Sequence, residues 1–397
     1  MLVPDQGSEP TLTSDSIWLQ TLGSTERRLL NESDPLPKTT EVGIIGAGMI
    51  GLAAAYYLSA AGLPSICIID RQSAVGEASG ANAGGLWFGQ QSPELGALAP
   101  LAQASSRLYD ELAAVPGPDF EFRRTGVLEL LRTEDDLLRA EERLSSVREA
   151  GFEAESIGCE ELQRLEPGLS EGQAGAVFYP QDAQLHPAKL GARLVRHLKN
   201  RNVKFCFHAE VASVGARLET SLGEIEATTV IIAAGAWTPL VTRTLGWTPP
   251  IKPMRGQLLA TVPLAPLLRH TVLGERYYYW QLSSGHVVGG GTVEDVGFAR
   301  GVDPRDLASI RSELEALFPQ LHDQPTACAW SGFRPYCEDM RPVIGKVPGR
   351  EHVYVAAGHF RKGILLAPVT GKILADLITR GKTNLPIEPL SPGRFGV

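Results

Sequence analysis

A glycine-rich turn, Gly46-Ala47-Gly48-Met49-Ile50-Gly51, constrains the fold of this chain more than any other feature. An apolar run at residues 41–45, short enough for a buried parallel strand, ends where the turn begins. Residues 52–61 follow the turn and are rich in Ala and Leu, which favour helix. A second apolar run at residues 65–69 leads directly into Asp70. Strand, turn, helix and second strand within about 30 residues predict a dinucleotide-binding unit.

Each glycine of the turn has a physical role in this interpretation. Gly46 permits the tight turn, Gly48 lets the backbone approach a pyrophosphate, and Gly51 lets the helix pack closely on the strand. Amide groups at the start of the helix would face the phosphates, because the helix dipole favours negative charge there. Asp70 stands where a carboxylate can accept hydrogen bonds from a ribose diol. The alternative is a helix entry that merely favours glycine.

The rest of the chain predicts two kinds of sheet. The pattern across residues 277–292 is typical of antiparallel strands that turn at residues 283–285. Short apolar runs elsewhere are typical of parallel or buried strands, and charged stretches between them indicate helices. We expect strands at residues 120–122, 127–131, 204–207, 229–233 and 353–356, and helices at residues 98–114 and 133–150.

These elements predict an α/β fold with two domains, because 397 residues exceed what one hydrophobic core usually serves. A Rossmann-like dinucleotide-binding domain is expected to be interrupted by an α+β substrate domain with a mostly antiparallel sheet. The expected boundaries are residues 1–38 for an N-terminal arm, 39–95, 155–250 and 328–397 for the dinucleotide-binding domain, and 96–154 and 251–327 for the substrate domain.

The arm at residues 1–38 is polar and contains Pro4, Pro10, Pro35 and Pro37. Within it, residues 17–30 predict one short amphipathic helix. The arm either packs on the body of the protein or docks a partner.

Composition excludes several classes of protein. A formal charge of −8 argues against nucleic-acid binding, which needs a basic surface. Five cysteines without paired spacing indicate reduced thiols, and no metal site is expected. The chain shows neither a secretory signal nor an apolar run of 18 residues, so no transmembrane segment is expected. We expect a cytoplasmic protein and leave peripheral membrane association open.

Beyond the glycine turn, several blocks of sequence resemble the D-amino-acid oxidase and glycine oxidase family of flavoproteins, which includes the flavin subunit of bacterial hydrogen cyanide synthase. The resemblance covers nearly all of residues 40–390. It is strongest at residues 46–51, Ala83-Gly84-Gly85-Leu86-Trp87, Ile232-Ala233-Ala234-Gly235-Ala236-Trp237, Met254-Arg255-Gly256-Gln257, Trp330-Ser331-Gly332-Phe333-Arg334-Pro335 and Gly358-His359-Phe360-Arg361-Lys362-Gly363-Ile364-Leu365.

The resemblance implies FAD as the cofactor, bound noncovalently. Cys337 is three residues past Arg334, but flavin-linking cysteines of sarcosine oxidases align nearer Gly332. In the family, residues 358–363 lead into a helix whose start faces the flavin, and the Val211 position meets the adenine through its backbone. The expected FAD-binding residues are Gly46, Ala47, Gly48, Met49, Ile50, Gly51, Asp70, Arg71, Ser79, Ala83, Gly84, Gly85, Val211, Ala234, Gly235, Trp237, Gly358, His359, Phe360, Arg361, Lys362, Gly363 and Ile364.

Three residues are expected at the catalytic centre by the same resemblance. Arg334 would clamp an amino-acid carboxylate with two parallel hydrogen bonds, a geometry that suits a guanidinium group. Tyr278 would bind the same carboxylate, and Arg361 would lie at the edge of the active site. The alternatives are a surface ion pair for Arg334, a buried strand aromatic for Tyr278, and a backbone-capping role for His359.

The resemblance implies oxidation of a small amino acid, of the glycine, sarcosine or D-amino-acid class, at its Cα–N bond. Hydride transfer to FAD would give an imine that hydrolyses to an oxo acid and ammonia. The electron acceptor would be oxygen or, in an amino-acid dehydrogenase subunit, a partner redox subunit or respiratory acceptor. A homo- or hetero-oligomer is expected. The third alternative is a flavin-binding structural or regulatory subunit without turnover.

Overall fold

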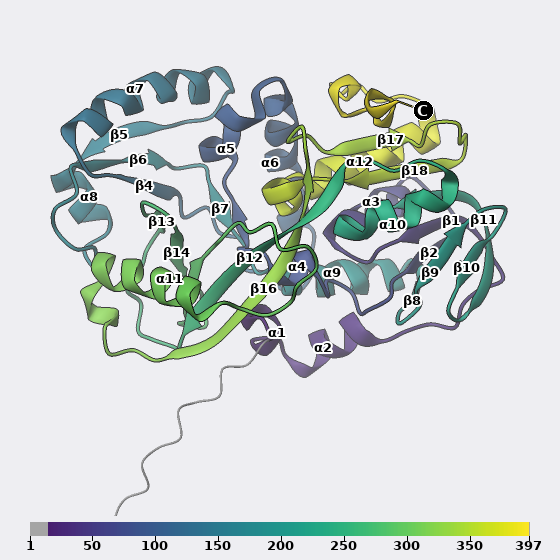
Figure 1. The fold of residues 1–397 in the computed structure, drawn as a ribbon, viewed down its shortest axis with the longest axis horizontal. Helices are drawn as coiled ribbons and strands as arrows, with labels where there is room; N and C mark the ends of the chain where they lie inside the picture. The colour runs from purple at the N-terminus through teal and green to yellow at the C-terminus, as the bar shows by residue number, and fades with distance from the viewer. Residues whose placement is uncertain (1–14, 397) are drawn as a thin grey trace, which may run out of the picture.

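The computed structural model describes residues 15–396 and contains two large sheets that lie side by side (Figure 1). The first sheet has the strand order β17-β18-β11-β1-β2-β8, and all its neighbours on this path are parallel except β17 and β18. Its strands are β1 (Thr39–Ile45), β2 (Ile66–Ile69), β8 (Lys204–Cys206), β9 (Val211–Val214), β10 (Leu218–Thr220), β11 (Gly223–Ile232), β17 (Val343–Lys346) and β18 (Val353–Ala357).

The centre of the first sheet is fully buried, as expected for parallel strands covered on both faces. Ile44 of β1 pairs with Ile231 of β11 on one side and with Ile68 of β2 on the other, and all three side chains are buried. On one face, α3 (Met49–Ala60) packs against α12 (Gly363–Arg380). A Cβ at Gly371 would lie 2.5 Å from the backbone of Ala53, so the two helices are in close contact. The helices α6 (Ala99–Ala114), α9 (Pro187–Lys199) and α10 (Thr238–Thr242) complete the cover.

The second sheet has the strand order β16-β12-β15-β14-β13-β4-β6-β5 and is antiparallel except for the β13–β4 pair. Helix α11 (Pro304–Leu317) packs on one face, where its buried Ile310 and Leu314 join the same apolar cluster as Tyr279. The strands are β4 (Val127–Leu131), β5 (Glu155–Gly158), β6 (Gly175–Tyr179), β12 (Ile251–Thr261), β13 (Thr271–Leu273), β14 (Tyr278–Gln281), β15 (Val287–Gly290) and β16 (Thr326–Cys337).

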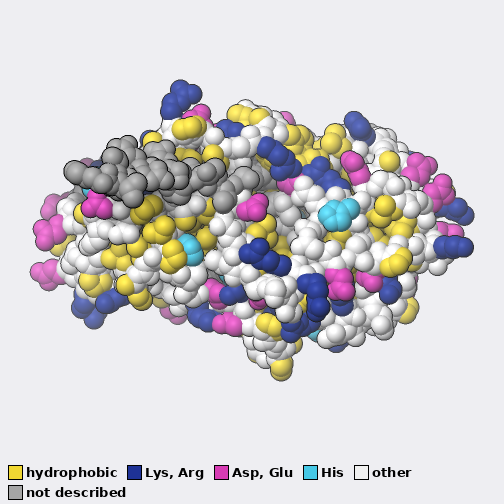
Figure 2. Space-filling view, turned by 90° about the horizontal axis from the view of Figure 1, so that it is seen from below, with side chains coloured by type: hydrophobic (Ala, Val, Ile, Leu, Met, Phe, Trp, Pro, Cys, Tyr) yellow, Lys and Arg dark blue, Asp and Glu magenta, His cyan; other side chains and the backbone are white. Residues whose placement is uncertain are grey.

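Short elements fill the region between and around the sheets. Among them, β3 and β7 form a two-stranded sheet. On the face of the molecule seen in Figure 2, acidic and basic side chains are interspersed. These elements are α4 (Ala78–Ala81), β3 (Gly85–Leu86), α5 (Phe88–Leu95), α7 (Glu134–Glu149), α8 (Cys159–Leu165) and β7 (Ala183–Gln184). None of the helices described between residues 15 and 396 is long and apolar enough to cross a bilayer.

The α/β fold expected from the sequence is confirmed, and so is the hairpin of β14 and β15 that turns at residues 283–285. The strand expected at residues 120–122 is wrong, because Glu121 has a φ of 58° and interrupts the extended backbone. The two-domain division remains a prediction. The strand pairing differs from the expected domain boundaries, since β5, β6 and residues 328–337 of β16 pair within the second sheet although they fall in the expected dinucleotide-binding segments. An apolar run predicts a strand but does not identify its partner.

The N-terminal arm packs on the body and contains two short helices in place of the single helix expected. These are α1 (Ile17–Gln20) and α2 (Ser24–Asn31), separated at Gly23, whose N–H donates to Glu26 Oε2 over 2.8 Å. Trp18 is fully buried, and its ring stacks at 6.3 Å on that of Trp280. Residues 1–14 of the expected arm lie outside the described residues.

We expect Trp18→Ala to lower the free energy of unfolding by about 3–5 kcal/mol, the usual cost of removing a fully buried large side chain. The measurement is urea unfolding of the purified protein. Leu138→Ala on α7 is the control, because Leu138 is 73% exposed and its loss should cost less than about 0.5 kcal/mol. Equal losses in the two variants would show that the arm contributes little to stability.

Candidate active site

A cavity of about 860 Å³ opens where the parallel strands β1, β11 and β18 end. Gly46, Ala234 and Ala357 line it from the first sheet, and Tyr278 and Arg334 line it from the second. The carboxyl edge of a parallel sheet is the usual ligand site of α/β folds. The cavity therefore lies where both sheets can contribute side chains to one bound molecule.

Most residues expected to bind FAD line this cavity. Five do not: Ala47, Gly51, Gly84, Gly358 and Lys362 belong to the same segments but are absent from its wall. The expected residues that line it are Gly46, Gly48, Met49, Ile50, Asp70, Arg71, Ser79, Ala83, Gly85, Val211, Ala234, Gly235, Trp237, His359, Phe360, Arg361, Gly363 and Ile364.

The glycine turn has no room for side chains at its two ends. Gly46 has a φ of 112°, and a Cβ there would lie 2.4 Å from Ala233 O. A Cβ at Gly51 would lie 1.9 Å from Gly46 O, so α3 begins in direct contact with the end of β1. At the start of that helix, Met49 N–H donates to Ser79 Oγ over 2.8 Å. The turn thus brings bare backbone to the cavity, which is the arrangement that dinucleotide binding requires.

Asp70 accepts two backbone hydrogen bonds, one of which comes from the glycine turn. Its Oδ2 accepts from Ala47 N–H over 2.7 Å, and its Oδ1 accepts from Gln72 N–H over 2.8 Å. Burial raises the pKa of the Asp70 carboxyl, and the two backbone donors and Arg71 offset part of that rise. A carboxylate has about four acceptor positions, so two remain for a ribose diol.

Aromatic and charged side chains meet next to Asp70. The Arg71 guanidinium lies 4.0 Å from the ring centroid of Trp237 and forms an ion pair of 2.7 Å with Glu77. Trp237 also stacks on Phe298 with 4.8 Å between the ring centroids. Arg71, Glu77 and Trp237 of this cluster line the cavity, as does Val211.

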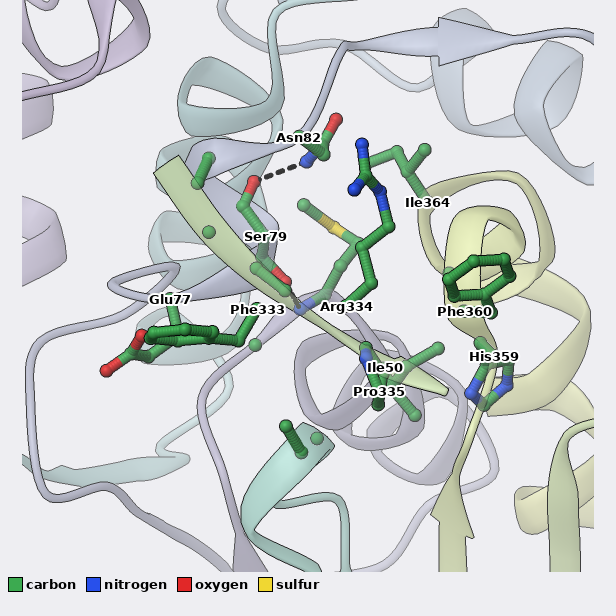
Figure 3. A pocket seen from close by; sticks show the side chains of 18 of the residues that line it. Ile50, Glu77, Ser79, Asn82, Phe333, Arg334, Pro335, His359, Phe360 and Ile364 are labelled. Atoms are coloured by element: carbon green, nitrogen blue, oxygen red, sulfur yellow. Dashed lines mark hydrogen bonds between the residues drawn. The ribbon is translucent and has the colours of Figure 1, made fainter. Parts of the chain in front are cut away.

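Local hydrogen bonds hold the segment of small residues that begins at Ser79. Ser79 belongs to the short helix α4, and Asn82 Nδ2 donates to Ser79 O over 2.6 Å (Figure 3). The Oδ1 of Asn82 accepts from Gly84 N–H over 2.6 Å. Gly84 has a φ of 72°, and a Cβ there would lie 2.4 Å from Leu185 O, so only glycine fits.

The segment before α12 contains a buried histidine and an ion cluster. His359 Nε2 lies 3.0 Å from Thr370 Oγ1, and burial lowers the pKa of His359 to about 3. Glu94 of α5 pairs with Arg361 at 3.1 Å and with Lys362 at 3.0 Å. Burial alone would raise the pKa of Glu94, but the two cations hold it below its usual value. His359 is therefore neutral near pH 7, and Arg361 shares the single carboxylate of Glu94 with Lys362.

Arg334 and Tyr278 converge on one point of the cavity. A Cβ at Gly291 would lie 2.4 Å from Tyr278 Oη and 2.9 Å from Arg334 Nη2. Arg334 Nη1 donates to Thr292 O over 2.7 Å, and a Cβ at Gly256 would lie 1.9 Å from the same Nη1. The guanidinium group thus packs against the backbone of Gly256 and Gly291, and its hydrogen bond to Thr292 O fixes its position. It makes no ion pair with any residue between 15 and 396.

Successive tyrosine side chains at the start of β14 point to opposite faces of the sheet. Tyr277 Oη donates to Ser309 Oγ over 3.0 Å and Tyr279 Oη donates to Ile310 O over 3.0 Å, both in α11. Tyr278 instead packs edge-to-face against Trp87, with 4.8 Å between ring centroids. Its side chain therefore lies on the cavity side of the sheet.

Sequence reasoning missed several residues that line the cavity. They include Asn82, Trp87, Gln91, Glu94 and Glu129. Trp87 stood within a family-like block, and Glu129 is the one acidic residue in the apolar run 127–131. The family-like block and the acidic residue in an apolar strand could each have identified a wall residue from the sequence. The segment that became α5 has no motif that distinguishes it from an ordinary surface helix.

Residues 41–377 match the family described as FAD dependent oxidoreductase. The chain is 31% identical to glycine oxidase of Geobacillus kaustophilus over 88% of this chain and 96% of that protein. It is 29% identical to hydrogen cyanide synthase subunit HcnC of Pseudomonas aeruginosa, over 90% and 97%. The crystal structure of glycine oxidase from Geobacillus kaustophilus superposes with a TM-score of 0.84 at 28% identity, covering 90% of this chain and 99% of that one.

The cavity fits FAD on observations independent of these similarities. The backbone cradle at Gly46 and Gly51 would be filled by any Cβ. Two buried polar atoms on the wall, Trp87 Nε1 and Gln91 Oε1, have no hydrogen-bond partner among the described residues. Buried polar groups normally have partners, so a polar molecule bound in the cavity would satisfy them.

We expect FAD to be held without a covalent bond. Cys337 is buried, it does not line the cavity among the described residues, and burial raises its pKa to about 11. A side chain at position 332 would meet Ala81 Cβ at 2.6 Å. Heat-denatured, centrifuged protein should therefore release all its FAD into the supernatant. Flavin absorbance that stays with the pellet would show a covalent link.

We expect His359 to make stability fall on acidification. Its pKa is about 3 in the fold against an ordinary value of 6.5, so below pH 6.5 the unfolded chain binds a proton that the folded chain does not. Between pH 7 and pH 5 this should cost about 2 kcal/mol. His359→Asn should remove that part of the pH dependence, whereas His352→Asn, at an exposed position, should not. Parallel unfolding curves for wild type and His359→Asn at both pH values would contradict the assignment.

Proposed function

The chain belongs to the FAD-dependent oxidoreductase family, and from that premise we propose that it oxidises a small amino acid at the Cα–N bond. The substrate class is glycine, sarcosine or a D-amino acid, a choice supported by the similarity to glycine oxidases. The observation that carries the proposal is the convergence of Arg334 and Tyr278 above Gly291, because this pair suits a carboxylate.

Arg334 is suited to hold the substrate carboxylate. The bond from Nη1 to Thr292 O leaves Nη2 directed toward Tyr278, and its charge has no acidic partner among the described residues. Two parallel hydrogen bonds from the guanidinium fix both the position and the rotation of a carboxylate. Tyr278 Oη supplies a third donor, and Trp87 keeps its ring in place. Orientation of this kind accounts for a large part of enzymatic rate enhancement.

The chemistry that bound FAD supplies is two-electron oxidation by hydride transfer. The substrate loses a hydride from Cα and a proton from nitrogen, and the resulting imine hydrolyses to an oxo acid and ammonia. His359 is the one histidine among the described residues of the cavity wall, and its Nε2 is engaged with Thr370. Since its pKa is about 3, it is too weak a base to take a proton from an ammonium group. If the substrate binds as the free amine, no residue has to act as a general base.

A second candidate is a dehydrogenase subunit that passes electrons to a partner, as the similarity to a hydrogen cyanide synthase subunit allows. Three exposed apolar side chains of one segment support this candidate, because an exposed apolar surface suits contact with a partner protein. Val293, Val296 and Phe298 are 48%, 40% and 41% exposed, and Phe298 stacks on Trp237 of the cavity wall. Hydrogen peroxide formation with a good substrate distinguishes the two, since an oxidase forms it and a dehydrogenase reduces an added dye instead.

We expect Arg334→Ala to lower kcat/KM by at least about a hundredfold, because two charge-assisted hydrogen bonds contribute about 1.5–3 kcal/mol each. Arg334→Lys should recover part of the loss, since lysine keeps the charge but loses the fork. The measurement is anaerobic flavin reduction by the best amino acid and by the matching amine without a carboxylate. Wild type should strongly prefer the acid, and Arg334→Ala should lose most of this preference.

Arg139→Ala on α7 is the matched control, because the Arg139 side chain is 76% exposed. FAD content should stay at the wild-type level in all three variants. An alanine variant at position 334 that still prefers the acid as wild type does would place the carboxylate elsewhere, and Arg361 would be the next candidate.

A further inference from the structure

The wall that presents Tyr278 continues across the second sheet to an acidic side chain, Glu129. Tyr278 of β14 pairs with Leu273 of β13, and Leu273 pairs in turn with Glu129 of β4. Residues directly opposite each other in a sheet point to the same face. Tyr278, Leu273 and Glu129 accordingly all line the cavity, on strands that lie next to one another in Figure 1.

Glu129 is held at this wall by a neighbouring hydroxyl group. Tyr179 Oη donates to Glu129 Oε2 over 2.9 Å. The ring of Tyr179 also marks the position of α5, because a Cβ at Gly89 would lie 3.3 Å from its Cδ1. The first turn of α5 therefore lies close to Glu129, and this turn carries Gln91.

The side chains at this end of the cavity attract hydrogen-bond donors. Gln91 is 8% exposed, and its Oε1 has no partner among residues 15–396. The indole of Trp87 also lines the cavity, packs against Tyr278 and offers a π face. Together with the carboxylate of Glu129, these groups suit a cation that donates several hydrogen bonds.

The distance across the sheet sets the size of the molecule that would reach both ends. One strand separates β14 from β4, so the two backbones are roughly 10 Å apart. A substrate whose carboxylate binds at Arg334 and Tyr278 would reach Glu129 only through an extended side chain. Long flexible side chains that end in a charge, like those of lysine and arginine, have this shape.

We propose that the substrates extend beyond small amino acids to those whose side chain ends in an ammonium or guanidinium group, and that Glu129 selects them. This inference rests on the proposed function, because it assigns the carboxylate end to Arg334 and Tyr278. It makes Glu129 a specificity residue at the far end of the same cavity.

The test compares lysine with norleucine, which has the same chain length without the charge, each as both enantiomers. Anaerobic flavin reduction by the holoenzyme should give a kcat/KM for lysine at least about tenfold above that for norleucine. Glu129→Gln should lose most of this ratio. Glu155→Gln is the matched control, since Glu155 lies exposed on β5 of the same sheet, and it should keep the ratio.

A charge reversal provides a test that misfolding cannot imitate. Glu129→Lys should reduce its flavin with glutamate faster than wild type does, by at least about tenfold, because the new ammonium group would pair with the side-chain carboxylate. Norleucine matching lysine in wild type, or an unchanged ratio in Glu129→Gln, would overturn the inference while leaving amino-acid oxidation intact. No flavin reduction by any amino acid would overturn the proposed function and this inference together.

Discussion

The contact between the backbones of Gly46 and Gly51 is the constraint on which the rest of the site depends. A Cβ at Gly51 would lie 1.9 Å from Gly46 O, so α3 can begin beside the end of β1 only with glycine there. That position brings α3 against α12, whose own first residues also line the cavity. Asp70 supports the same geometry from β2 by accepting the Ala47 N–H. The starts of α3 and α12 and the ends of the strands thus form one binding surface, and its shape depends on the absence of a Cβ at Gly46 and Gly51.

Among the cationic side chains of the cavity wall, some form ion pairs with acidic residues and Arg334 does not. Arg361 and Lys362 both pair with Glu94, and Arg71 and Arg300 both pair with Glu77. Arg334 is bound to a carbonyl oxygen and makes no ion pair with any residue of the described range. A partly buried charge without an opposite charge is less favourable than a paired one, and an anionic ligand would supply the missing partner. An anionic substrate therefore gains more at Arg334 than at any paired cation of the wall.

Local patterns in the sequence were enough to predict the first sheet and its glycine turn. The apolar runs, the glycine spacing and Asp70 lie within about 30 residues, so each supports the others. The second half of the site depends on contacts that no local pattern contains. Arg334 and Tyr278 are far apart in the chain and meet only because β16 and β14 lie in one sheet, and their roles were expected from family resemblance alone. The first turn of α5 lies near Glu129 because Gly89 packs against the ring of Tyr179. The second helix of the arm begins after Gly23, whose N–H donates to Glu26.

The long pairing of β12 with β16 has a mechanical consequence. Its register runs without interruption from Ile251–Cys337 to Ala260–Cys328. At one end, Ile251 and Cys337 are part of the apolar core beneath the first sheet, and towards the other end Leu259 and Ala329 are part of the core beneath the second. A stiff ribbon embedded in both cores resists hinge rotation of one half against the other. The spacing between the strand ends of the first sheet and the Arg334 side of the second is therefore set by this ribbon.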